Sequence, residues 1–210
     1  MTRAVLFATA LALASRAGAA AVSEPCAKAS GAQGPDDPEL REWLRALVHQ
    51  VAREEGVDPY ALEALGMTET TLQPALGRSC ELGPFQVMPW WAGIFRLDSP
   101  LLLWDPRINA IAAARIYKAA WRRWEARFSR AGRNRALRAA GWRGPLDRET
   151  FAALAYNWGK APRAFAQAAD LRLVAIPAST ASYALRFKLA LREARERARA
   201  DNGTPRARSP

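Results

Sequence analysis

Residues 56–74, GVDPYALEALGMTETTLQP, contain one complete helix with its start and stop signals. Asp58 is a residue type favoured at a helix N-cap, and Pro59 fits the first helical position, where no backbone N–H is needed. Apolar residues recur at three- and four-residue spacing, and Glu69 falls on the same face in the last turn. Pro74 then stops the helix. The stretch therefore predicts a helix that carries a carboxyl group on its apolar face.

A carboxyl group in this position suits general acid chemistry. Burial raises a carboxyl pKa, and the negative end of the helix dipole acts in the same direction. An acid that stays protonated near neutral pH can protonate a leaving-group oxygen. Taken alone, the helix fits an exposed rim glutamate better, because surface glutamates are common. The assignment of Glu69 therefore depends on the rest of the sequence.

Helical patterns recur along the chain, and convincing alternating patterns of β-branched residues do not. Apolar spacing predicts helices over residues 39–55, from Asp105-Pro106 onward, and over 150–156, 162–171 and 183–197. Residues 78–91 lack such periodicity and predict a loop. We therefore expect a mainly α fold, organised as a single catalytic domain with little or no β structure.

Four ordered segments resemble the signatures of a known family. They are Gly56-Val57-Asp58-Pro59 with Glu69-Thr70-Thr71-Leu72-Gln73-Pro74, then Gly83-Pro84-Phe85-Gln86-Val87-Met88-Pro89, then Asp105-Pro106-Arg107-Ile108-Asn109, and finally Ala155-Tyr156-Asn157-Trp158-Gly159. Together they resemble the soluble lytic transglycosylase (SLT-domain) family, the bacterial relatives of goose-type lysozyme. The resemblance covers most of residues 40–190 and implies a lysozyme-like domain.

This resemblance implies an enzyme that cleaves the MurNAc-GlcNAc β-1,4 bond of peptidoglycan and leaves a 1,6-anhydroMurNAc end. Glu69 would be the single catalytic residue, first as acid and then as base. The N-acetyl group of the substrate would replace the second carboxylate of ordinary glycosidases. The residues that would bind the substrate are Thr70, Gly83, Gln86, Met88, Tyr156, Asn157 and Trp158. No cofactor is implied, and with only two cysteines and one histidine we expect no metal site.

Glu81 is the most notable departure from the family pattern, which usually has a small residue there. A second carboxylate would permit water-activating hydrolysis, so Glu81 is a candidate second acid, although a loop charge is the commoner interpretation. The first alternative function is thus a lysozyme-type muramidase. The second, from another class, is an inactive wall-binding module of a secretion or flagellar apparatus.

The N-terminus predicts export. Residues 1–21 have a positive start, a short apolar run and small residues for cleavage, as in a secretory signal peptide. We therefore expect a periplasmic protein without a transmembrane segment. Residues 22–38 predict a flexible leader, followed by the catalytic domain over residues 39–195. In an oxidising compartment Cys26 and Cys80 predict a disulfide, with two unpaired thiols as the alternative.

The formal net charge of +11 predicts an anionic partner. Arginine is dense in residues 130–147, interpreted as a basic insertion, and in residues 196–210, interpreted as a basic disordered tail. Peptidoglycan glycan strands and anionic wall polymers fit this charge, whereas the signal peptide argues against nucleic acid.

The eight tryptophans divide by context. Trp90, Trp91 and Trp158 stand beside motif residues and are candidates for stacking on sugars. Trp43, Trp121 and Trp124 lie on predicted helices, and we expect them to pack in the core or between helices.

Overall fold

The computed structural model describes residues 37–203, with the side chains of residues 37–201. The described chain is mainly helical, and its β pairing consists of two isolated bridges, Leu76 with Leu82 and Leu82 with Val87. The mainly α prediction is confirmed. The described chain divides into two compact units: unit 1 contains residues 37–56 and 69–115, and unit 2 contains residues 57–68 and 116–203. Each unit is described by itself.

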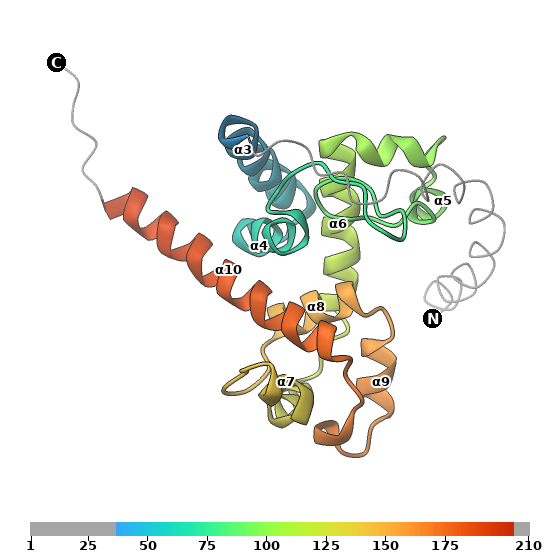
Figure 1. Ribbon diagram of the computed structural model, residues 1–210, viewed down its shortest axis with the longest axis vertical. Helices are drawn as coiled ribbons and strands as arrows, with labels where there is room; N and C mark the ends of the chain where they lie inside the picture. Colours follow the sequence, from blue (N-terminus) through green and yellow to red (C-terminus); the bar gives the residue numbers. More distant parts are fainter. Residues whose placement is uncertain (1–36, 204–210) are drawn as a thin grey trace. The chain divides into compact units, whose positions relative to one another are not determined.

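Unit 1 combines helices with a long irregular segment (Figure 1). Its elements are α3 (Pro38–Glu55), the last two residues of α4 (Pro59–Thr70), α5 (Trp91–Phe95), the 3-10 helix η1 (Pro100–Trp104) and the first part of α6 (Pro106–Trp121). The core is built from α3, the irregular segment and α6, with Leu44, Val48, Val51, Leu72, Leu82, Phe85, Val87, Leu103, Ala110 and Ala113 buried.

Aspartate-proline pairs begin three of the helices. Asp105 Oδ1 accepts the N–H groups of the second and third residues of α6 at 2.8 and 2.9 Å. Asp58 Oδ1 accepts the Tyr60 N–H at 2.9 Å, and Asp37 caps α3 in the same way as Asp105 caps α6. These caps satisfy backbone donors that have no partner within the helix. The helix starts predicted at Asp58-Pro59 and Asp105-Pro106 are therefore confirmed.

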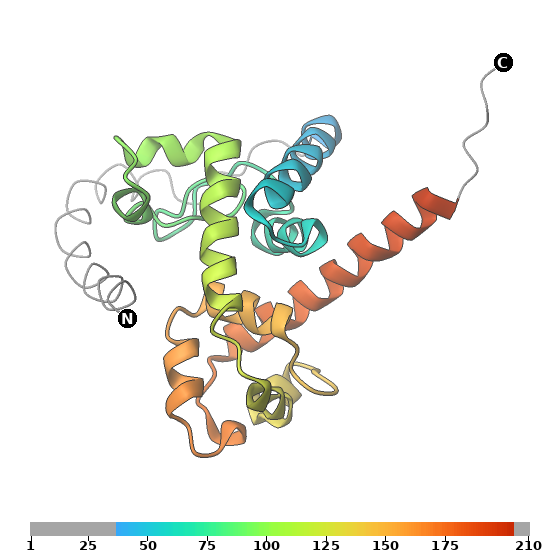
Figure 2. The same ribbon diagram turned by 180° about the vertical axis from the view of Figure 1, so that it is seen from behind.

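Unit 2 is built around the long helix α10, which packs along α8 and contacts α7 (Figures 1 and 2). Its elements are the first ten residues of α4, the rest of α6, η2 (Ala126–Arg133), α7 (Arg135–Ala139), α8 (Arg148–Asn157), α9 (Ala161–Gln167), η3 (Leu171–Leu173) and α10 (Ala178–Gly203). Phe128, Phe151 and Phe165 form an aromatic core with ring centroids 5.1–5.5 Å apart. Trp124 packs on Phe128 and Phe151, as expected for a core tryptophan.

The basic stretch 130–147 differs from the predicted surface insertion. Leu137, Trp142 and Leu146 are buried, so the stretch is a folded layer of unit 2 with its arginines on the outside. The high arginine content of the sequence hides a few widely spaced apolar residues that supply the packing. Trp43 was also expected to be packed, but it is 54% exposed.

The basic tail begins later than predicted, because α10 continues to Gly203. Residues 192–200 are Arg, Glu and Ala, which are strong helix formers. Two ion pairs within unit 2 join this end of α10 to α4: Arg195 with Asp58 at 2.6 Å and Arg197 with Glu63 at 2.5 Å. Residues 196–203 are therefore part of the folded unit.

Several predictions fall on residues 1–36 and 204–210, which lie outside the described residues. They are the signal peptide, most of the leader, the last part of the tail and the pairing of Cys26 with Cys80. Among the described residues, no helix is both long enough and apolar enough to cross a membrane.

Candidate functional site

Glu69 is the second-last residue of α4 and belongs to unit 1. Its side chain is half-buried, as are those of Met67 and Thr68 before it, and the buried Thr70 follows. A half-buried carboxyl group at a helix end is accessible to a substrate and still has protein on one side. This placement fits the acid role that the sequence predicts for Glu69.

Thr70, the neighbour of Glu69, ties the end of α4 to the loop of residues 82–88. Its buried hydroxyl donates to the Pro84 carbonyl oxygen at 2.8 Å and accepts the Gln73 N–H at 3.0 Å. Both bonds lie inside the protein, so this hydroxyl is committed to structure. Thr70 is therefore better placed to fix the position of Glu69 than to bind a substrate directly.

The backbone after Glu69 adopts conformations that side chains usually avoid. Thr71 and Leu72 have φ angles of 58° and 59°, and Cys80 and Gln86 have φ angles of 69° and 49°. Left-handed backbone is unfavourable for residues other than glycine, above all for a β-branched threonine. Such strain persists only where the surroundings enforce it, and it is concentrated at functional sites. In unit 1 it is concentrated in the segment that follows Glu69.

Asn109 of α6 holds the 82–88 loop in place. Its completely buried side chain donates from Nδ2 to the carbonyl oxygens of Leu82 at 2.8 Å and Leu103 at 2.9 Å. Its Oδ1 accepts the Phe85 N–H at 2.9 Å. One side chain thus satisfies three backbone groups of irregular structure. The sequence placed Asn109 in a motif but gave it no role.

Gln86 and Gly83, predicted to bind the substrate, also shape the loop. Gln86 Nε2 donates to the carbonyl oxygens of Ala75 at 3.0 Å and Gly83 at 2.9 Å. Gly83 has a φ of +73°, and a Cβ there would lie 2.7 Å from Asn109 Cγ. Only glycine fits this position without strain or displacement of Asn109. Met88 follows on the same loop and is half-buried.

Glu81, the candidate second acid, interacts with its own turn. Its Oε2 accepts the Ser79 N–H at 2.9 Å. A Cβ on Gly77 would overlap the carboxylate of Glu81 and the amide of Gln86, so the three residues are packed closely together. These contacts favour the interpretation of Glu81 as a structural loop charge.

An aromatic stack continues the loop beyond Met88. The rings of Trp90 and Trp91 are stacked with centroids 4.5 Å apart, and Trp91 stacks on Phe95 at 5.4 Å. All three side chains are half-buried, so part of the stack is exposed. Partly exposed aromatic faces are suited to contact the apolar face of a sugar.

The remaining predicted residues belong to unit 2, at the end of α8. Tyr156 and Trp158 are half-buried, whereas Asn157 is exposed. Asn157 Oδ1 accepts a hydrogen bond at 2.9 Å from the hydroxyl of Thr180, a buried residue near the start of α10. This bond links the Ala-Tyr-Asn-Trp-Gly signature to the first turn of α10. The predicted site residues thus form two groups, one in each unit.

No group of three or more His, Cys, Asp and Glu side chains in the described part of the chain is arranged to hold a metal ion. Comparison of the chain with protein-family models, with curated proteins and with solved structures gave no match.

Proposed function

We propose that the protein is an exported peptidoglycan lytic transglycosylase with Glu69 as its catalytic residue. The observation that carries the proposal is the construction around Glu69. A half-buried carboxyl group ends a helix, its neighbour Thr70 fixes that helix end to the 82–88 loop, and a strained turn follows directly. Strain and buried polar contacts of this kind hold a reactive group in one geometry.

The reaction needs one carboxyl group in two protonation states. Protonated Glu69 gives its proton to the glycosidic oxygen as the bond from C1 of MurNAc to that oxygen breaks. The carbonyl oxygen of the substrate's N-acetyl group stabilises the positive charge that develops at C1. Ionised Glu69 then takes the proton from the C6 hydroxyl of the same sugar, and the C6 oxygen bonds to C1. The product is a 1,6-anhydro ring, and Glu69 is protonated again.

In this proposal the loop residues hold the backbone beside Glu69 in a fixed conformation. Gln86, Gly83 and Asn109 fix the backbone of the 82–88 loop, and the stack that begins at Trp90 offers an aromatic face to the glycan. Tyr156, Asn157 and Trp158 are proposed to bind the substrate on the strength of the sequence resemblance. The proposal also includes export by residues 1–21 and a Cys26–Cys80 disulfide.

The lyase outcome is favoured over hydrolysis by the contact of Glu81. In inverting hydrolysis by two carboxylates, the second one activates a water molecule. The carboxylate of Glu81 instead accepts a hydrogen bond from its own turn. Attack by the C6 hydroxyl needs only the carboxyl group of Glu69, so it is the simpler route.

Purified sacculi digested with the wild-type protein and with Glu69→Gln test the proposal. Mass spectrometry of the soluble fragments should show muramoyl ends one water lighter than reducing ends, released by the wild type only. Glu81→Gln is the matched control, since it makes the same chemical change on a nearby loop. Normal cleavage by Glu69→Gln would refute the catalytic assignment, and reducing ends from the wild type would identify a hydrolase.

A further inference from the structure

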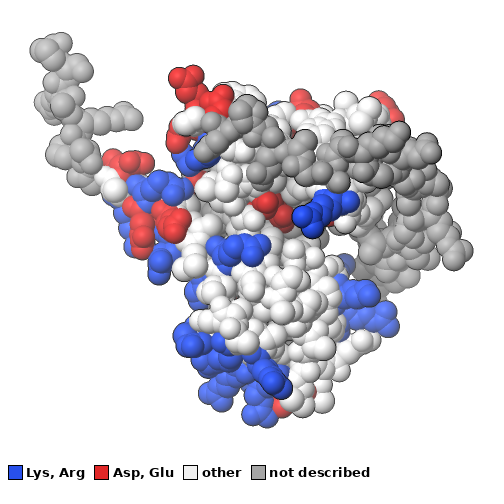
Figure 3. Space-filling model, viewed as in Figure 1, with Lys and Arg blue, Asp and Glu red and all other residues white. Residues whose placement is uncertain are grey.

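One segment of unit 2 is rich in arginine and lacks acidic residues. Residues 126–146 contain six arginines and no Asp or Glu. Phe128, Leu137, Trp142 and Leu146 of this segment are buried, so the arginines lie on its outer side. Figure 3 shows Lys and Arg gathered on the surface over α7. This is a folded basic surface on η2, α7 and the loop after α7, which we call the arginine face; it consists of Arg127, Arg130, Arg133, Arg135, Arg138 and Arg143.

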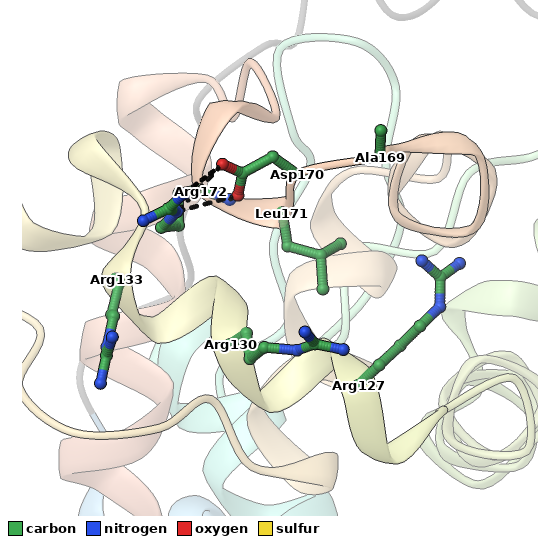
Figure 4. Close-up of a pocket in the computed structure, with 7 residues that line it drawn as sticks. All are labelled: Arg127, Arg130, Arg133, Ala169, Asp170, Leu171 and Arg172. Carbon is green, nitrogen blue, oxygen red and sulfur yellow. Dashed lines mark hydrogen bonds and ion pairs between the residues drawn. The ribbon is translucent and has the colours of Figure 1, made fainter.

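Two cavities open along the arginine face, and they share two arginines. The first, of about 340 Å³, lies between η2 and η3 and is lined by Arg127, Arg130, Arg133, Ala169, Asp170, Leu171 and Arg172 (Figure 4). The second, of about 440 Å³, is lined by Ser129, Arg130, Arg133, Arg138, Gly144 and Pro145. Arg130 and Arg133 thus line both cavities.

Two of the lining arginines are already committed to the protein. Arg127 donates to Glu125 at 2.7 Å and to the Ala166 carbonyl oxygen at 2.7 Å, near the end of α9. Arg172 holds both oxygens of Asp170, at distances of 2.6–3.0 Å. The hydrogen bonds from Arg172 to the carboxylate lower the pKa of Asp170 to about 2, so this pair stays ionised at ordinary pH.

Arg130 and Arg133 differ from these two. Both are exposed, and neither forms a hydrogen-bonded ion pair with a carboxylate in the part of the chain that the structure describes. Their guanidinium groups therefore keep donors available for an external anion. A guanidinium group binds a phosphate or a carboxylate with two parallel hydrogen bonds.

We propose that Arg130 and Arg133 bind a linear polyanion, with successive oxyanion groups, phosphate or carboxylate, seated in the two cavities. A linear polymer fits better than a single anion because the shared arginines stand between two recesses. Neither lining set includes an aromatic side chain, so the stacking that single-stranded nucleic acids use has no platform there. The proposal is independent of Glu69 and of wall cleavage.

Binding of fluorescent inorganic polyphosphate and of polyglutamate to the full chain, measured by anisotropy, tests the site. Arg130→Gln with Arg133→Gln should weaken binding of at least one polymer by roughly tenfold at low salt, since two charge-assisted contacts are lost. The slope of log affinity against log salt should also fall by about two. Arg130→Lys with Arg133→Lys should restore the salt slope and only part of the affinity. Lysine keeps the positive charge but cannot form the two parallel hydrogen bonds of a guanidinium group.

Arg122→Gln with Arg123→Gln is the matched control, since these exposed arginines of unit 2 line a different cavity. This control should change affinity and slope far less. Equal losses in both double variants would overturn the site and leave only an effect of net charge. The site would also be overturned if neither polymer binds. Binding of anionic phospholipid vesicles instead, lost in Leu173→Ser, would identify a membrane surface. Leu173 is 80% exposed and follows Arg172 in the chain, so it is the apolar side chain that would insert into a membrane.

Discussion

The two units carry opposite charge. The described residues of unit 1 contain nine carboxylates against seven Lys and Arg, and those of unit 2 contain nine carboxylates against nineteen. Two arginines of unit 1 are paired with glutamates of α3: Arg107 with Glu54 at 2.6 Å and Arg115 with Glu55 at 2.8 Å. Among the described residues, the net positive charge thus comes from unit 2. The proposed acid and the proposed anion site lie in different units, so they can be tested separately.

The units also share a structural device. Asn109 in unit 1 and Asn134 in unit 2 are both buried, and each donates from Nδ2 to backbone carbonyl oxygens of irregular structure. Asn134 donates to Val174 at 2.7 Å and Arg172 at 3.1 Å, and its Oδ1 accepts the Ala136 N–H at 2.9 Å. In one unit this device holds the loop next to Thr70; in the other it holds the segment that carries Arg172.

The largest effects are expected from removing the buried asparagine side chain of each unit. Asn109→Ala should lower the free energy of unfolding by about 3 kcal/mol, because three buried backbone groups lose their partner. Asn134→Ala should cost about 2 kcal/mol. Urea denaturation measures both. Below the unfolding transition, Asn109→Ala should reduce wall cleavage and spare polyanion binding, and Asn134→Ala should do the reverse. A loss of both functions in both variants would show that the units do not act separately.

A smaller loss is expected at the end of α10. The side chain of Glu63 is 2% exposed and pairs with Arg197. Arg197→Ala removes the cation from a buried carboxylate and should destabilise the protein by about 2 kcal/mol, less than a fully buried pair because Arg197 is partly exposed. Changing Glu63 to Leu in the same chain should recover much of the loss. Equal stabilities of Arg197→Ala and wild type would contradict the assignment of residues 196–203 to the fold.

Gly83→Ala should destabilise unit 1 by about 1–2 kcal/mol, because alanine is strained at a φ of +73° and its Cβ would meet Asn109. Gly159→Ala in unit 2 is the matched control, since a Cβ there would enter open space. Thermal unfolding of the two variants compares them directly. If Gly83→Ala unfolds at the wild-type temperature, the close packing of the loop against Asn109 is wrong.

The smallest effect is expected for Glu81→Gln. The glutamine oxygen can still accept the Ser79 N–H, so cleavage rates should stay within a factor of about two of the wild type. The initial rate of fragment release from sacculi measures this. A fall of about a hundredfold would identify Glu81 as a second acid or base.

The sequence predicted the local features of the fold. Aspartate caps, first-turn prolines and apolar spacing act within a few residues, so α4 and α6 were found with their starts. The features that the sequence did not predict depend on partners far away in the chain. Arg195 and Arg197 meet carboxylates more than 130 positions earlier in the chain, so the sequence suggested a loose tail.

The candidate site shows the same division. The position of Glu69 in the last turn of its helix and a loop over residues 78–91 were predicted from the sequence, but the contacts of Thr70 were not. Its partner is the carbonyl oxygen of Pro84, and every residue has such a group, so the sequence holds no signal for it. The left-handed backbone of Thr71 and Leu72 was equally hidden, because neither residue type favours it.

The most direct test of the account is a single experiment on sacculi with wild type and Glu69→Gln, in which binding and cleavage are measured in the same tube. Sedimentation gives the bound protein, and mass spectrometry gives the released anhydro-muramoyl fragments. We predict that Glu69→Gln binds sacculi as the wild type does, because the proposed glycan-binding residues and the arginine face are unchanged, and releases no fragments. Fragments with anhydro ends released by Glu69→Gln at the wild-type rate would contradict the central claim that Glu69 performs the chemistry.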